Sequence, residues 1–296
     1  MSDGFLLIDK AQGWTSHDVV ARSRRLLHTR KIGHAGTLDP MATGLLVLGV
    51  GRATRLLTYL VGADKQYTTT MRLGQATVTD DAEGEVTAAS GVDDAESIQA
   101  RLEDAVAELT GPIQQVPSSV SAIKVDGKRS YARVRGGEQV ELSARPVTVH
   151  AFDVHDVREA RAADGTAVLD VDAAVTCSSG TYIRALARDL GTALGTGGHL
   201  TALRRTRVGP FDVSRAEPLE AHTAALDMTD VTDVLRAAFR VRTLSEEETR
   251  EIRFGRRIGA TGTDAVVAAL APDGHGVALL QDAEDRARPV LVLDPA

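Results

Sequence analysis

Residues 33–44 read GHAGTLDPMATG, a glycine-rich loop that separates two predicted elements. Glycines and a proline surround a single carboxylate there, Asp39. Loops that a rigid scaffold positions often carry catalytic groups, so Asp39 is a candidate for chemistry. A simple Asp-Pro turn explains the same residues, and from the loop alone the turn is the better interpretation.

The segments around this loop alternate between predicted strands and helices. Residues 5–8 are an apolar run typical of a strand, and Ser16 is a good N-cap for a helix that ends near Leu27. Residues 45–50 predict a second apolar strand, and the threonine-rich residues 67–73 predict a third. The mixture of strands and helices indicates an α/β (α+β) fold.

Two further segments bear on the candidate site. Residues 80–94 are acidic and turn-like, and we expect an exposed connection there. From Tyr182 a helix is predicted to about Leu194, with an apolar stripe along one face. Arg184 and Arg188 lie four residues apart, so they share a different face of that helix.

The end of the chain predicts a small β-rich module. Residues 245–248 form a capping box that opens a helix ending near Gly255. Strand-like runs follow at 265–270, 276–280 and 290–293. We therefore expect two domains, a main domain over residues 1–240 and a C-terminal domain over residues 241–296.

The composition excludes several classes of protein. With 43% hydrophobic and 25% charged residues the chain is ordinary for a globular protein. No run approaches the roughly 20 apolar residues that span a bilayer, and the N-terminus lacks the basic start of a signal peptide, so we expect a cytoplasmic protein with no membrane partner. Cys177 is the only cysteine, which excludes a thiolate metal cluster. Residues 49–51 lack the third glycine of a dinucleotide-binding motif, so no nucleotide cofactor is expected.

The charges are segregated along an acidic chain. The net charge is -7, yet residues 1–60 hold eight Lys and Arg against four Asp and Glu, while residues 61–120 hold three against eleven. A basic face for nucleic acid can therefore exist on this protein, although any one cluster is equally consistent with a solvated surface. Further basic residues gather at Lys124, Lys128, Arg129, Arg133, Arg135, Arg204, Arg205 and Arg207.

Four sequence blocks occur in a characteristic order. They read LIDKAQGWTS at 7–16, GHAGTLDPMATGLL at 33–46, DKQY at 64–67 and GTYIRAL at 180–186. Together with PSSVSAIK at 117–124 and HLTALRR at 199–205, they resemble the hallmark segments of bacterial TruB-type tRNA pseudouridine synthases. The resemblance covers roughly the first 215 residues. Ala11 and Ala35 depart from the family pattern, which has proline at the first position and threonine or glycine at the second.

The resemblance implies a fold and an activity. The fold would be that of pseudouridine synthases, with a mixed, largely antiparallel central sheet in a catalytic domain and a PUA-like C-terminal domain. The activity would be isomerisation of the uridine at position 55 in the T-loop of tRNA, with the base flipped out of its stack. This reaction needs neither a metal nor a cofactor. The expected partner is the T-arm of tRNA, bound by a monomer.

Catalytic roles for three residues follow from the resemblance. Asp39 is the family's nucleophile or the stabiliser of the detached sugar, and attack on the ribose or on the base both stay open. Tyr67 matches the tyrosine that stacks on the flipped base. Arg184 matches the arginine that pairs with the aspartate. Without the resemblance, Tyr67 would be interpreted as a core residue and Arg184 as an exposed helical arginine.

The remaining site residues are expected to bind the RNA. His34 matches a histidine that takes the place of the extruded base, and Tyr182 and Leu203 are expected to line the pocket. Lys10 and Lys65 are expected either to contact phosphates or to be solvated. Residues 117–146 correspond to the family's insertion that clasps the T-loop, and its basic members fit phosphate contacts. Those members are Lys124, Lys128 and Arg129.

Two other functions stay open on the sequence. One is a tRNA-binding or folding factor in which catalysis is secondary. The other is a phosphatase or glycosidase with an aspartate nucleophile, for which the loop lacks the expected partner carboxylate. A substitution of Asp39 distinguishes the first alternative from the enzyme, because only the enzyme needs that carboxylate.

Overall fold

The computed structural model describes residues 3–118, 124–125, 128–129, 142–219 and 227–296. The chain forms two compact units. Unit 1 comprises Met1–Asp39, Leu45–Val61 and Gly209–Ala296, and unit 2 comprises Pro40–Gly44 and Gly62–Val208. The chain therefore leaves unit 1 directly after Asp39.

Unit 1 is built around an apolar pair of strands. Strand β1 (Gly4–Lys10) lies next to β3 (Thr43–Val50), and both are almost wholly buried, as their continuous hydrophobic runs predict. The short strand β14 (Glu217–Pro218) joins β1 in parallel, and β2 (Ile32–His34) joins β3 in antiparallel register. After β3 come the 3-10 helix η1 (Gly51–Arg55) and helix α2 (Leu57–Val61).

Helix α1 (Ser16–Leu26) connects β1 to β2, and the loop that carries Asp39 follows β2. The prediction that Ser16 caps this helix is wrong by one residue. Thr15 is the N-cap: its hydroxyl accepts the Asp18 N–H, and the Asp18 carboxylate accepts the Thr15 N–H in return. The Ser16 hydroxyl is thereby left to bond elsewhere.

Unit 2 contains an antiparallel sheet in the order β12-β4-β11-β10-β7. At its β12 edge, Thr43 and Gly44 of β3 pair in parallel with Arg204 and Arg205. The prediction of a mixed, largely antiparallel sheet is confirmed. The strands are β4 (Lys65–Leu73), β7 (Gly111–Gln115), β10 (Arg145–Arg161), β11 (Ala167–Cys177) and β12 (Gly198–Val208).

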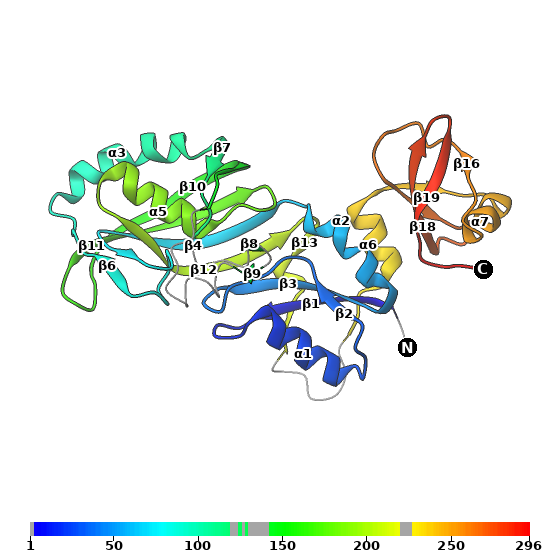
Figure 1. Ribbon diagram of the computed structural model, residues 1–296, viewed down its shortest axis with the longest axis horizontal. Coiled ribbons are helices and arrows are strands. Elements are labelled where there is room, and N and C mark those ends of the chain that lie inside the picture. The colour runs from blue at the N-terminus through cyan, green and yellow to red at the C-terminus, as the bar shows by residue number, and fades with distance from the viewer. Residues whose placement is uncertain (1–2, 119–123, 126–127, 130–141, 220–226) are drawn as a thin grey trace. The chain divides into compact units, whose positions relative to one another are not determined.

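Two helices pack on this sheet. Helices α3 (Ala95–Glu108) and α5 (Ile183–Leu194) contact each other, α5 lies against β12 and β4, and α3 lies against β10 (Figure 1). The predicted apolar stripe of α5 faces the interior, with Leu186, Leu190 and Leu194 buried. A small hairpin, β5 (Ala76–Thr77) with β6 (Val86–Ala88), follows β4.

The C-terminal part of unit 1 has its own five-stranded sheet, as expected of a β-rich module. The order is β15-β17-β18-β19-β16, and Ser245 opens α7 (Glu246–Arg253) with the predicted capping box. The domain boundary near residue 241 stays a prediction. The other elements are α6 (Val231–Ala238), β15 (Arg240–Thr243), β16 (Ile258–Gly259), β17 (Val267–Leu270), β18 (Gly276–Ala283) and β19 (Arg286–Val292).

Gly44 marks a close approach of two backbones in unit 2. Its φ is +98°, and a Cβ there would lie 2.8 Å from the Arg205 nitrogen and closer still to the Arg205 carbonyl oxygen. We expect Gly44→Ala to lower the free energy of unfolding by about 3 kcal/mol or more, because the backbones must separate. Gly195→Ala is the control, since Gly195 has a φ of +75° with nothing within 4 Å and should cost only about 1 kcal/mol. Denaturant titration of both variants tests this, and equal losses would contradict it.

Candidate active site

The Asp39 loop is held at two points within unit 1. The Ala35 N–H donates to the Val47 carbonyl at 2.9 Å, which anchors the loop to β3. The Leu38 N–H donates to Ser16 Oγ at 2.8 Å, and Ser16 Oγ donates to the Leu38 carbonyl at 3.1 Å. Asp39 is half-buried and follows directly on this second anchor.

Ala35, the residue of this loop that departs from the family pattern, lies inside the fold. Its side chain is fully buried, and its N–H donates to the Val47 carbonyl of β3. The departure therefore falls where the loop is anchored.

His34 ends β2 and lies beside α1. It is half-buried, and its ring packs edge-on against the His17 ring with 6.1 Å between the centroids. Residues 16 and 17 of α1 thus contact both halves of the loop. The predicted contact of His34 with RNA stays a prediction.

Lys10 is not the surface lysine that the sequence suggested. Its side chain is 1% exposed, and Nζ donates to the Trp14 carbonyl at 2.7 Å and to the Ala11 carbonyl at 3.1 Å. A buried ammonium needs such acceptors. In this structure Lys10 fastens the turn that leads into α1, and its predicted contact with a phosphate stays a prediction.

Tyr67, Lys65 and Leu203 share one face of the unit 2 sheet. Tyr67 pairs with Arg205 across β4 and β12, and Thr69 pairs with Leu203. Because side chains alternate along a strand, Tyr67 and Leu203 are diagonal neighbours on this face. Both are at the limit of burial, so the structure brings these two predicted residues together in unit 2.

Arg205 on the same face was assigned to a surface cluster, which is wrong. Its side chain is 1% exposed, whereas Arg204 and Arg207 are half-buried. The signal was present in the sequence, since Arg205 has the same strand parity as Leu203 and therefore faces inward. Only Arg204 and Arg207 of this cluster can contribute to a basic surface.

Lys65 is buried beside this second cation. Its side chain is 6% exposed, and Nζ donates to the Ala63 carbonyl. Burial first, and then the positive charge of Arg205, lowers the pKa of Lys65 from 10.5 to about 8. Lys65, like Lys10, is therefore no solvated lysine.

The shifted pKa of Lys65 predicts how stability depends on pH. Between about pH 8 and pH 10 the unfolded chain holds the Lys65 proton more tightly than the folded protein, so stability rises with pH in this window. We expect wild type to gain on the order of 1 kcal/mol relative to Lys65→Met between pH 7 and pH 10. Urea unfolding of both proteins at several pH values measures this difference. A constant difference would contradict the shifted pKa.

Arg184 is buried at the start of α5 and paired within unit 2. Nη1 donates to Asp81 Oδ2 at 3.2 Å and to the Thr79 carbonyl at 2.9 Å, and both charged side chains are at most 5% exposed. Asp81 also accepts the Thr79 hydroxyl and the Glu83 N–H. The arginine is therefore held by a dense polar network, and it is not an exposed helical arginine.

Asp81 lies in the acidic segment that was expected to be exposed. That expectation is wrong for Asp80 and Asp81, which are 8% and 2% exposed. Asp80 accepts from Arg188 Nη1 at 3.1 Å, just as Asp81 accepts from Arg184. The two arginines on one face of α5 thus explain why two carboxylates are buried.

Tyr182 is the N-cap residue of α5 and is half-buried. Its N–H donates to Gln115 Oε1 at 2.8 Å, and Gln115 Nε2 donates to its carbonyl at 3.1 Å. Gln115 at the end of β7 is 2% exposed and was not predicted from the sequence. This amide clamp fixes the turn that delivers Tyr182 and Arg184.

The basic residues of the predicted insertion lie on a small hairpin. Strand β8 (Lys124–Val125) pairs with β9 (Lys128–Arg129), and Lys124 is opposite Arg129. Residues 119–123, 126–127 and 130–141 of the predicted insertion lie outside the described residues.

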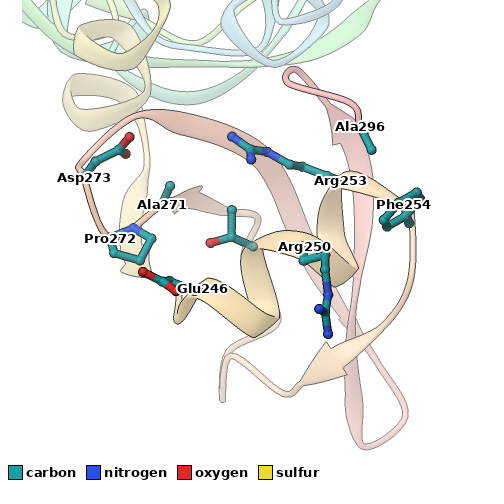
Figure 2. A pocket seen from close by; sticks show the side chains of 9 residues that line it. Glu246, Arg250, Arg253, Phe254, Ala271, Pro272, Asp273 and Ala296 are labelled. Carbon is teal, nitrogen blue, oxygen red and sulfur yellow. The ribbon is translucent and has the colours of Figure 1, made fainter.

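The C-terminal module has a pocket of its own, shown in Figure 2. Arg250, Arg253 and Phe254 come from α7 and its end, and Glu246 and Asp273 also line the pocket. Arg253 is paired with Asp294. Charges of both signs therefore surround the pocket, and none of the predicted site residues lines it.

Within the described ranges, no group of three or more His, Cys, Asp or Glu side chains is arranged to hold a metal ion. Across the same residues, no helix is long and apolar enough to cross a membrane.

The fold has a counterpart among solved structures. Over 99% of this chain and 84% of the other, the fold is similar to that of a solved H/ACA RNP bound to a substrate RNA containing 2′-deoxyuridine, with a TM-score of 0.70 and 22% sequence identity. At that identity the likeness concerns the fold.

The chain belongs to the TruB family of pseudouridylate synthases. The model of the N-terminal domain of that family matches residues 24–183, and the model described as tRNA pseudouridine synthase II, C terminal, matches residues 239–294. The chain is 61% identical to tRNA pseudouridine synthase B of Arthrobacter sp. (strain FB24), with 100% of this chain and 98% of the relative covered. It is 54% identical to tRNA pseudouridine synthase B of Thermobifida fusca (strain YX), with 99% of each covered. The sequence-based prediction of the family is confirmed, and the protein is an enzyme that isomerises uridine to pseudouridine in tRNA.

Proposed function

We propose that this enzyme modifies the uridine at position 55 in the T-loop of tRNA, with Asp39 as the catalytic carboxylate. The observation that carries the proposal is the pair of hydrogen bonds that the Ser16 hydroxyl makes with the backbone of Leu38. Leu38 directly precedes Asp39 in the loop. A single carboxylate on an anchored loop suits a reaction that needs one nucleophile or one charge stabiliser. The resemblance at residues 33–46 supports the same assignment.

The proposed chemistry balances without a co-reactant. The bond from C1′ of the ribose to N1 of the base breaks, the base turns, and C1′ bonds to C5. The proton on C5 leaves to solvent, and N1 gains a proton. Asp39 either attacks to form a covalent intermediate or stabilises the detached sugar, and in both cases the carboxylate is regenerated.

Tyr67 supplies the aromatic face for the extruded uracil. Unstacking a base removes its neighbours, and an aromatic side chain replaces part of that stacking. Leu203 lies diagonally beside Tyr67 on the same sheet face and extends the apolar surface. His34 and Tyr182 complete the proposed substrate-binding set.

We assign to Arg184 the role of the arginine that, by the family resemblance, pairs with Asp39. Its network with Asp81 and the Thr79 carbonyl supports this assignment, because a buried arginine held by fixed acceptors is preorganised. The reaction then needs no reorientation of that charge.

The T-arm would be held by phosphate contacts away from the reacting base. Lys124, Lys128 and Arg129 bring basic residues together on one hairpin, which suits a polyanion. The C-terminal module is proposed to add a PUA-like RNA contact. We propose that one copy of the chain suffices for the reaction.

Position mapping tests the proposed target. Unmodified tRNA transcripts incubated with the enzyme should gain one pseudouridine, at position 55, and a transcript with cytidine at that position should gain none. Sequencing after chemical labelling of pseudouridine measures the result. Modification at another uridine of tRNA would leave the enzyme class intact and overturn the proposed position.

A further inference from the structure

Helix α1 buries two serines that differ in what they bind. Ser16 is 1% exposed and Ser23 is fully buried, and they lie seven residues apart on the same face of the helix. Ser23 Oγ donates to the Val19 carbonyl of its own helix at 2.9 Å. Ser16 Oγ instead bonds to Leu38, 22 residues further along the chain.

The Ser16 hydroxyl holds two successive peptide groups. It accepts the Leu38 N–H, which belongs to the peptide bond between Thr37 and Leu38. It donates to the Leu38 carbonyl, which belongs to the peptide bond between Leu38 and Asp39. Two fixed peptide planes around the Leu38 Cα restrict the direction in which the backbone continues to Asp39.

The side chain of Leu38 adds a third restraint. It is 4% exposed, so the residue is anchored by an apolar contact as well as by its polar backbone groups. Both hydrogen bonds with Ser16 are buried, and removing the hydroxyl would take away a partner of two buried backbone groups. The loop would have to move to satisfy them.

The neighbouring residue explains why Ser16 is available for this task. Thr15 already caps α1 through the Asp18 N–H, so the helix does not need the Ser16 hydroxyl. The Thr15 hydroxyl thus caps the helix, and the adjacent Ser16 hydroxyl binds the loop.

We infer that Ser16 is a positioning residue for the reaction, acting on Asp39 through the Leu38 backbone. The inference rests on the proposed role of Asp39. A misplacement of a reacting group by about 1 Å can lower the rate of the chemical step by about 100-fold, while the contacts that bind the rest of the substrate stay in place. Ser16 therefore contributes to the rate of isomerisation, and tRNA binding does not depend on it.

Ser16→Ala and Ser23→Ala form a matched pair for the test. Each removes one buried hydroxyl from the same face of α1, but only the first touches the loop. We expect Ser16→Ala to slow single-turnover isomerisation at saturating enzyme by at least about tenfold, with the Kd for tRNA unchanged within about twofold. Ser23→Ala should keep the wild-type rate within about twofold. Tritium release from tRNA labelled at C5 of uridine measures the rate, and filter binding measures the Kd.

Several outcomes would overturn the inference. They are a wild-type rate for Ser16→Ala, an equal rate loss in both variants, or a loss that appears only in the Kd. If Ser16→Ala does not fold, Ser16→Cys replaces the hydroxyl by a somewhat larger thiol that hydrogen-bonds only weakly, and its rate should fall below that of wild type. An unchanged rate in the folded Cys variant would equally overturn the inference.

Asp39→Asn, run in parallel, separates this inference from the proposed function. If the Asp39→Asn enzyme is active, the proposed role of Asp39 is wrong. If Asp39→Asn is inactive and Ser16→Ala keeps the wild-type rate, only the proposed role of Ser16 is wrong.

Discussion

We expect the Asp39→Asn enzyme to form no measurable pseudouridine in tRNA. The amide has nearly the size and shape of the carboxylate, so the loop held by Ser16 should keep its conformation. The amide is neither an anion nor a nucleophile of useful strength, and loss of a catalytic nucleophile lowers the rate by at least about four orders of magnitude. Tritium release from C5-labelled tRNA under single-turnover conditions measures this loss.

Binding should survive the same change. In the proposed mode of binding, phosphate contacts supply most of the affinity for tRNA and Asp39 does not contribute to them, so the Kd should stay within about twofold of wild type. Asp18→Asn is the matched control, because Asp18 belongs to the same unit and its carboxylate completes the capping box of Thr15 at the start of α1. That variant should retain the wild-type rate. A normal rate for Asp39→Asn would show that the proposed mechanism is wrong.

Local patterns in the sequence are sufficient for the main elements. The apolar runs that become β1 and β3, and the stripe that buries one face of α5, each encode their burial within a few residues. The capping box at Ser245 likewise lies within a single turn. Such elements can be predicted because the information that determines them is contiguous.

The contact that Ser16 makes could not be predicted in this way. Thr15 and Ser16 both suit an N-cap, and Asp18, three residues after Thr15, favours Thr15 through a capping box, which our prediction overlooked. The Ser16 hydroxyl bonds instead to the Leu38 backbone, and Leu38 lies 22 residues away. This distant contact places Ser16 in the candidate site.

The buried charges were missed for a related reason. Asp81 looks exposed in its acidic segment because its partner Arg184 is distant in sequence. Arg205 looks like part of a surface cluster, although its parity with Leu203 indicated burial. A charged residue is expected outside unless a partner is known, and Asp81 and Arg184 become neighbours only in the folded protein.

Arg184→Lys should be the second most damaging substitution. Arginine presents a planar fork of five N–H groups, and one nitrogen of this fork already serves Asp81 and the Thr79 carbonyl. Lysine keeps the charge, but its three N–H donors radiate from one nitrogen and cannot reproduce the planar fork that serves this network and, as we assign it, the aspartate. We expect the single-turnover rate to fall by about 100- to 1,000-fold, with the Kd for tRNA little changed.

Arg188→Lys provides the comparison one helical turn away. Arg188 also bonds a buried aspartate, Asp80, and the Val116 carbonyl, so its replacement disturbs a similar network on the same face of α5. If Arg184 acts only by stabilising unit 2, both variants should lose similar stability and similar activity. If Arg184 supplies charge to the reaction, the rate should fall in Arg184→Lys alone, and the free energies of unfolding should stay comparable. Measuring unfolding and tritium release on both variants therefore distinguishes a catalytic arginine from a structural one, and equal rates would exclude the catalytic role.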